Sequence, residues 1–225
     1  MSINIAIDGP SGAGKSTLSR RLAKSLGFLY VDTGALYRAV GLYMYENGIL
    51  PDDEGSVVKA LDNVKVELKY ADGEQAVILN GKNVSDDIRK HEISEYASKV
   101  SAMPEVRKFL FETQRSIAKR NNVIMDGRDI GTVVLSDAQI KIYLTATAED
   151  RAKRRFNELK ERGQNVNFEQ IYHDVIERDE RDINREIAPL RQADDALLVD
   201  TTGFSFEKSY NKLLSIIKER LNEIL

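Results

Sequence analysis

The residues best suited to chemistry stand in one short stretch near the start of the chain. The sequence GPSGAGKST, residues 9–17, fits the pattern G-x-x-x-x-G-K-[ST], with Lys15 and Ser16 at its end. Glycines let a backbone curl with its N–H groups pointing inward, and a helix that begins there adds its positive end. Lysine can then reach the β- and γ-phosphates of a nucleotide, and the serine hydroxyl can bind Mg²⁺. The stretch predicts a phosphate-binding loop.

The alternative is a glycine turn before an ordinary helix. A lysine in the first turn of a helix is electrostatically unfavourable unless an anion sits there, which favours the phosphate interpretation. The residues predicted to contact the nucleotide phosphates are Gly9, Pro10, Ser11, Gly12, Ala13, Gly14, Lys15, Ser16 and Thr17.

A second group of polar residues follows another apolar run, in VDTGALYR (residues 31–38). Asp32 or Thr33 suits the N-cap of a helix, which would be a purely structural role. Tyr37 and Arg38 then fall one turn into that helix. An arginine near a helix N-terminus is unfavourable unless it meets an anion, so we predict a phosphate contact for Arg38.

A third group, MDGRDIGT (residues 125–132), places Asp126 at the end of a buried strand. A solvated turn is the simple alternative, but parallel sheets bind ligands at this end of their strands. Asp126 could orient Mg²⁺ or its water molecules. Arg128 could hold a second phosphate, and Asp129 offers an acceptor to a ligand that carries N–H groups.

Two arginine-rich segments are less decisive. In RDERDINR, the residues Arg178, Asp182 and Arg185 fall within about 60° of one another on a helix, which taken alone favours an intrahelical ion pair worth ~0.3–0.5 kcal/mol. In DRAKRR (residues 150–155), Arg151 and Arg155 share a side with Arg154. That side could be a solvated face, a nucleic-acid patch or a mobile flap over a triphosphate.

Five short apolar runs separated by helical patterns must position these groups. They predict strands at about 3–7, 28–31, 122–126, 141–144 and 196–200, and therefore a parallel sheet covered on both faces. Alternating segments at 64–70 and 76–79, with turns at ADGE (71–74) and NGK (80–82), predict a small antiparallel insert. The fold class is α/β, with helices at about 15–26, 93–102, 104–120 and 148–187.

Composition narrows the function classes. The chain has 225 residues and a net charge of −3, so it suits one α/β unit and lacks the surplus of Lys and Arg that general nucleic-acid binding needs. It has no cysteine, which excludes disulfides, Cys-ligated zinc and thiol nucleophiles and fits a reducing compartment. No stretch approaches the ~18 apolar residues that span a bilayer. We therefore expect a soluble, cytoplasmic protein.

Five segments together resemble one family. The stretches DGPSGAGKST, VDTGALYR, MDGRDIGTVV, ERDERDINREIAPL and DDALLVDTT occur in this order and spacing in bacterial cytidylate kinases, and the resemblance spans about residues 3–220. It implies one three-layer P-loop kinase domain over 1–225. Within it, the monophosphate-binding region would be about 34–120, with the antiparallel insert at about 60–85. The helical lid and its following helix would cover about 148–187.

The resemblance implies phosphoryl transfer from ATP, with Mg²⁺, to CMP or dCMP, by a monomer without nucleic-acid or membrane partners. By similarity, the acceptor phosphate would be surrounded by Thr33, Tyr37, Arg38, Arg128 and Arg185. Ser98, Arg107 and Asp129 would contact cytosine, and Arg178 and Asp182 the sugar. The catalytic group would be Lys15, Arg128, Arg185, Arg151 and Arg155, and the metal ligands Ser16 and Asp126.

The base assignment has a physical logic. Cytosine presents an amine donor beside acceptors at N3 and O2, which a carboxylate and an arginine or serine complement; uracil presents a carbonyl where cytosine has the amine. Two alternatives remain. One is a P-loop kinase for UMP, AMP or a metabolite. The other is a nucleotide-dependent switch that binds RNA or protein, against which the acidic balance and the acceptor-side arginines argue.

Overall fold

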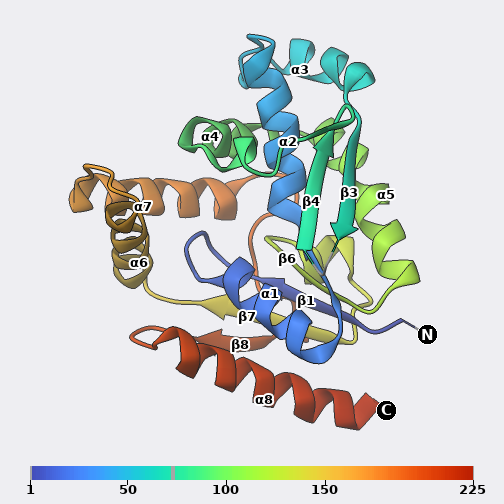
Figure 1. Cartoon of the computed structure of the whole chain (residues 1–225), viewed down its shortest axis with the longest axis vertical. Helices are drawn as coiled ribbons and strands as arrows, with labels where there is room; N and C mark the ends of the chain where they lie inside the picture. Colours follow the sequence, from blue (N-terminus) through green and yellow to red (C-terminus); the bar gives the residue numbers. More distant parts are fainter. Residues whose placement is uncertain (1, 72–73, 225) are drawn as a thin grey trace.

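The computed structural model describes residues 2–71 and 74–224. Its centre is a five-stranded parallel sheet in the order β2-β6-β1-β7-β8 (Figure 1). The strands are β1 (Asn4–Asp8), β2 (Leu29–Asp32), β6 (Val123–Gly127), β7 (Ile140–Thr145) and β8 (Leu197–Asp200). The predicted α/β class and all five predicted strands are confirmed.

Helices cover both faces of this sheet, because its central strand is apolar on both sides. Ile5 and Ile7 of β1 pack in one cluster with α1 (Lys15–Leu26) and α8 (Phe206–Ile224). Ala6, on the opposite face, packs in a cluster that includes Ala118 of α5 (Pro104–Arg120). The result is the predicted three-layer arrangement. None of the helices in the described residues is both long and apolar enough to cross a membrane.

A third cluster of buried apolar residues lies outside the parallel sheet, and the predicted insert is part of it. The antiparallel sheet β3-β4-β5 consists of β3 (Val66–Ala71), β4 (Glu74–Leu79) and β5 (Lys82–Asn83), and it packs against α2 (Thr33–Glu46). The NGK turn is confirmed, since Asn80 and Gly81 have φ of 48° and 86°. The ADGE turn falls partly outside the described residues.

Four short elements of this region were not predicted from the sequence. They are α3 (Glu54–Ala60), η1 (Leu61–Asn63), the two-residue strand β5 and η2 (Asp87–Arg89). Each is too short to show a hydrophobic period. The helix α4 (His91–Val100) begins two residues earlier than predicted and packs across α2.

The charged stretch forms two helices, α6 (Ala148–Glu161) and α7 (Phe168–Asn184), joined through Gly163 and lying at one side of the sheet (Figure 1). They share a small cluster made by Ala152, Ile171 and Val175. The predicted helical stripe of residues 178, 182 and 185 is wrong in one respect. Helix α7 ends at Asn184, and Arg185 is extended, with φ −63° and ψ 139°.

Candidate active site

The loop between β1 and α1 has the geometry of an anion cradle. Gly9 has φ 150°, and a Cβ there would stand 1.9 Å from the carbonyl oxygen of Leu144. Gly14 is the left-handed N-cap of α1, with no side-chain cap among the residues that the structure describes, and no acidic residue occupies the first turn. The first N–H groups of α1 are therefore left for a ligand, and phosphate oxygens suit them.

Lys15 is held in the loop by neutral partners. Its side chain is buried, and Nζ donates to the carbonyl oxygens of Gly9 and Pro10 at 2.8 Å each. Burial, and next the charge of Arg128, lower the pKa of Lys15, while Asp126 opposes the shift. A buried cation bonded to carbonyls gains charge compensation when an anion enters the loop.

Ser16 and Asp126 meet beside this lysine. Ser16 Oγ donates to Asp126 Oδ2 at 2.9 Å, and Asp126 Oδ1 is buried with no hydrogen-bond partner in the described part of the chain. Burial, and next the charge of Asp32, raise the pKa of Asp126 to about 6. Within residues 2–71 and 74–224 no cluster of three acidic or histidine side chains could hold a metal alone. One carboxylate and one hydroxyl fit Mg²⁺, which completes its shell with phosphate oxygens and water.

The start of α2 lies against the same strand end. Asp32 is the N-cap, accepting from the backbone N–H of Ala35 at 3.0 Å, and it also accepts from Arg38 Nη2 at 2.8 Å. Thr33 Oγ1 donates to the carbonyl oxygen of Asp126 at 2.7 Å. Both the capping role and the placement of Arg38 at this edge of the sheet follow the sequence expectation.

Arg128, in the loop after β6, is paired with α7. Its Nε donates to Asp182 Oδ2 at 2.8 Å. Burial of Asp182 acts to raise the pKa of its carboxyl, but the charges of Arg128, Arg178 and Arg185 together hold that pKa below its ordinary value. Arg178 Nε is buried without a hydrogen-bond partner among the described residues. Burial, and next Arg128, lower the pKa of Arg178 to about 10, and Arg38 adds to this effect. A buried guanidinium nitrogen with no hydrogen-bond partner in the described part of the chain indicates a site for an anion or a polar ligand.

Asp129 is held between two arginines from different elements. Arg107 of α5 forms an ion pair with it, and Arg185 Nη2 lies 3.5 Å from Asp129 Oδ1. Arg107 also lies over the ring of Tyr37, 5.7 Å from its centroid, and donates to the carbonyl oxygen of Ser101 at 3.1 Å. The structure thus brings together the three residues Arg107, Asp129 and Arg185, which the sequence separates by up to 78 positions.

The α6 arginines divide into two kinds. Arg151 is buried and donates to the carbonyl oxygen of Ser11 at 2.9 Å while pairing with Asp179. Arg154 donates to the carbonyl oxygen of Ala13 at 3.3 Å, so both contact the glycine loop. Arg155 instead pairs with Glu158 on its own helix, 3.0 Å away, and is partly exposed.

Ser98 lies on α4, and its carbonyl accepts from Ser101 Oγ at 2.9 Å. Its half-buried hydroxyl makes no hydrogen bond to another described residue, so nothing ties it to Asp129 directly. Ser98 is connected to the pair of Arg107 and Asp129 indirectly, through Ser101, whose carbonyl oxygen accepts a hydrogen bond from Arg107.

Sequence reasoning missed Asp8, the last residue of β1. Its two carboxylate oxygens accept the backbone N–H groups of Ile130 and Gly131, at 2.7 Å each. Burial raises the pKa of Asp8 to about 6. The signal that singled out Asp126, an ionisable residue that ends an apolar strand, also applies to Asp8.

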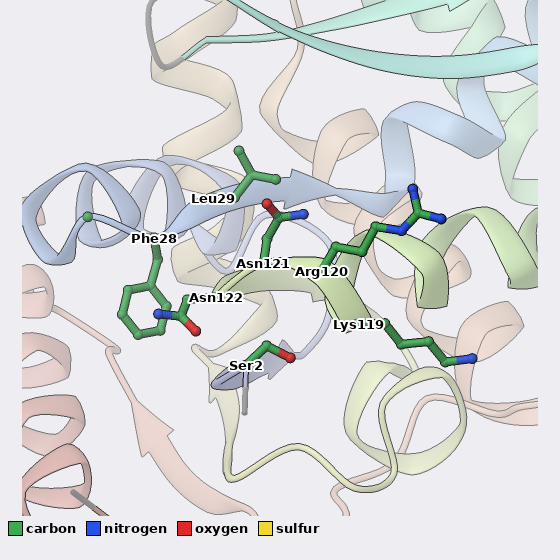
Figure 2. Close-up of a pocket in the computed structure, with 8 residues that line it drawn as sticks. Ser2, Phe28, Leu29, Lys119, Arg120, Asn121 and Asn122 are labelled. Atoms are coloured by element: carbon green, nitrogen blue, oxygen red, sulfur yellow. The ribbon is translucent and has the colours of Figure 1, made fainter.

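An open hollow of about 770 Å³ lies at the other edge of the sheet (Figure 2). Its lining residues precede β1, β2 and β6 or, in the case of Leu29, begin β2, so it opens at the amino ends of the strands. In Figure 2 the charged ends of Lys119 and Arg120 extend away from Phe28. None of the described residues that line it is acidic. It has no part in the site described above. Its lining residues are Ser2, Gly27, Phe28, Leu29, Lys119, Arg120, Asn121 and Asn122.

Comparison with known proteins agrees with this geometry. A family model described as cytidylate kinase matches residues 5–219. A cytidylate kinase of Caldicellulosiruptor bescii is 51% identical over 95% of each chain, and one of Carboxydothermus hydrogenoformans is 50% identical over 99% of this chain and 100% of its own. A crystal structure of an uncharacterized protein from Eubacterium ventriosum, 13% identical, shares the fold with a TM-score of 0.54 over 97% of this chain and 99% of its own. The chain belongs to the cytidylate kinase family.

Proposed function

We propose that the glycine loop binds ATP and that the arginine group binds CMP or dCMP, so that the two face each other across the edge of the sheet. Family membership makes the chain an ATP-dependent nucleoside monophosphate kinase, which forms ADP and CDP or dCDP. One observation carries the pairing of sites. Ser16 of the loop donates to Asp126 Oδ2 at 2.9 Å, and Thr33 of the acceptor group donates to the carbonyl oxygen of Asp126 at 2.7 Å, so the two sites meet at this residue.

The donor site is residues 9–17. Their N–H groups and Lys15 hold the triphosphate, and Ser16 and Asp126 would hold Mg²⁺, which neutralises phosphate charge when it is bound. The buried Asp126 Oδ1 without a partner supports this assignment. Arg151 and Arg155 belong to the proposed lid, about residues 148–187, and the contact from Arg151 to Ser11 supports a lid that is seated on the loop.

The acceptor site is assembled from the remaining residues. The groups proposed for the acceptor phosphate are Thr33, Tyr37, Arg38, Arg128 and Arg185. Arg178 and Asp182 face the sugar, and Ser98, Arg107 and Asp129 face cytosine. The ion pair between Arg107 and Asp129 supports the base assignment, since it offers a donor and an acceptor side by side.

The reaction then depends on positioning and charge rather than on a general base. The acceptor oxygen belongs to a phosphate whose second pKa is near ~6, so it is largely ionised at neutral pH. The obstacle is repulsion between two anions. Lys15 and Arg128 would contact the donor and acceptor phosphates and reduce that repulsion, and closure of α6 and α7 would exclude water.

An acceptor panel tests the proposal. ADP formation is measured with CMP, dCMP, UMP and AMP under the same conditions, with MgATP saturating. We expect CMP and dCMP to be the fastest acceptors, and AMP to be poor. Faster turnover with AMP or UMP would assign the site to another acceptor. Calorimetric titration with CMP in the absence of ATP excludes a switch if CMP binds with a single-site isotherm.

We further propose that the kinase works as a monomer in the cytoplasm. Residues of one chain supply both nucleotide sites, and a chain without cysteine suits a reducing compartment. Analytical ultracentrifugation at working concentrations tests the monomer, and a dimer at all concentrations would contradict it.

A further inference from the structure

Asp8 ties the end of β1 to the loop that carries the acceptor residues. Its side chain is 4% exposed, and each of its two oxygens accepts one backbone N–H, from Ile130 and from Gly131. Those two residues follow Arg128 and Asp129 directly in the chain. The carboxylate therefore holds the first turn after them.

The sheet does not need these two bonds. The backbone of Asp8 already pairs with Gly127 of β6 on one side and with Tyr143 of β7 on the other. Burying a carboxylate there is unfavourable, and the raised pKa of Asp8 reflects that burial. The backbone of Asp8 is already fixed by the sheet, so a carboxylate that is unfavourable to bury indicates that its two hydrogen bonds serve the loop after Asp129.

The loop after Asp129 is an irregular turn. Residues 130–134 form a single turn of π-helix (η3), closed by the N–H of Leu135 to the carbonyl oxygen of Ile130 at 2.7 Å. Such turns are rare and are frequent at functional sites. A Cβ on Gly131 would stand 3.3 Å from Asp8 Oδ2 and 3.2 Å from Lys141 Cδ, so the carboxylate and this glycine fit closely.

We propose that Asp8 is a positioning residue of the acceptor site. Through its two bonds it sets the direction in which Arg128 and Asp129 leave the strand, and thereby the base selection that Asp129 performs. Asp8 touches neither nucleotide. The inference rests on the proposed role of Asp129 toward cytosine.

The test is Asp8→Asn, which keeps the size of the side chain but turns an amide group toward one of the two N–H donors. Losing one charged hydrogen bond should raise KM for CMP by about tenfold and lower the preference for CMP over UMP. KM for ATP should stay within twofold, because the loop N–H groups remain. Asp53→Asn is the matched control, since Asp53 accepts the N–H of Ser56 at 3.1 Å at the start of α3 and should leave both KM values unchanged.

A second variant keeps the test decisive if the first one does not fold. Gly131→Ala retains Asp8 and pushes a methyl group against it, so the shift in CMP over UMP preference should have the same direction. If Asp8→Asn does not fold, as thermal melting would show, Gly131→Ala decides alone.

Two outcomes overturn the inference and can be told apart. A wild type with no preference for CMP over UMP would refute the assignment of Asp129 and this inference with it. A wild type that prefers CMP, with variants that melt at lower temperature and keep both the KM for CMP and that preference, would make Asp8 a structural residue only.

Discussion

The two halves of the site are built in different ways. The donor half is built around nine consecutive residues, 9–17, whose backbone N–H groups are its main contacts, and Asp126, Arg151 and Arg155 add to them. The acceptor half takes its charged side chains from α2, α5, the loop after β6, α7 and the residue after α7. A local backbone shape is therefore encoded in a few adjacent residues, whereas a cage of side chains depends on the whole fold.

Their charges are also compensated differently. Among the described residues Lys15 donates to carbonyl oxygens alone, and its pKa is lowered by burial, so this buried cation is held at some cost to stability. The acceptor arginines are mostly paired, Arg128 with Asp182 and Arg107 with Asp129. Substitution of Lys15 should thus reduce activity without destabilising the fold. Substitutions in the acceptor half should also destabilise the fold.

The largest effect is expected for Lys15→Ala. Loss of this cation removes charge stabilisation from the transferring phosphoryl group, and we expect kcat/KM to fall by about 100- to 1000-fold. The melting temperature should not fall, since an unfavourable buried charge is lost as well. Steady-state kinetics and thermal melting check both statements. A variant with normal turnover would refute the assignment of the loop.

Arg128→Ala, in the acceptor half, should lose stability as well as activity. It leaves Asp182 buried without its partner, so we expect a loss of about 3 kcal/mol in the free energy of unfolding, together with weak CMP binding. Adding Asp182→Ala should recover part of that loss, because the unpaired charge disappears. Urea denaturation of the two single variants and the double variant measures this. Equal stability of Arg128→Ala and wild type would remove the distinction between the two halves.

The same contrast explains what could be predicted from the sequence. The strands, the glycine loop and the insert follow from local periodicity and turn residues, and they were predicted nearly at their bounds. Arg178, Asp182 and Arg185 have helical spacing, so local reasoning favoured an intrahelical ion pair. The structure shows that Asp182 pairs with Arg128, 54 positions away, and that Arg185 lies past the end of α7. Only the fold could show those contacts.

Family resemblance supplied what the residues did not. Arg107 and Ser98 have no signal of their own in an amphipathic helix, because charged and polar residues are ordinary on its wet side. Arg107 is in fact buried against Asp129 and Tyr37. The same resemblance groups Arg155 with Arg151, but the two differ in their contacts. Arg155 forms an ion pair with Glu158 within one turn of its own helix, a pair that requires nothing from the rest of the fold.

Asp129→Asn refines the comparison within the acceptor half. The amide keeps the size of the carboxylate but can donate to a carbonyl as well as accept from an amine, so uracil is no longer repelled. We expect the ratio of kcat/KM for CMP over UMP to fall by about 10- to 100-fold, the range of a charged hydrogen bond. Competition kinetics measures the ratio. Asp137→Asn, an exposed position, is the control, and an unchanged ratio in Asp129→Asn would end the base-reading role.

Asp126→Asn tests the charge cost in the donor half. The pKa of Asp126 is raised in the folded state, from 3.8 to about 6, so the fold favours its neutral form. The stability that this group contributes is present below pH ~4 and lost as the pH rises through ~6. The variant should therefore be more stable than wild type at pH 8, by about 1–3 kcal/mol, because the amide buries no charge; the attraction to Lys15 is already included in the pKa of about 6. Without Mg²⁺, thermal melting should show this difference shrinking toward pH 4. A difference that grows toward acid would contradict the cause.

Arg155→Ala should have the smallest effect and tests whether the lid moves. Arg155 is partly exposed and paired with Glu158 three positions on, a contact worth at most ~0.5 kcal/mol, so the melting temperature should stay within ~2 °C. To act on ATP, Arg155 must leave Glu158 when the lid closes. We then expect kcat to fall by ~3- to 10-fold, about the value of one exposed charged contact. Lys153→Ala, with its equivalent pair to Glu149, is the control. If both variants keep full kcat, Arg155 has no part in catalysis, and the lid arginines that remain are Arg151 and Arg154, which already contact the glycine loop.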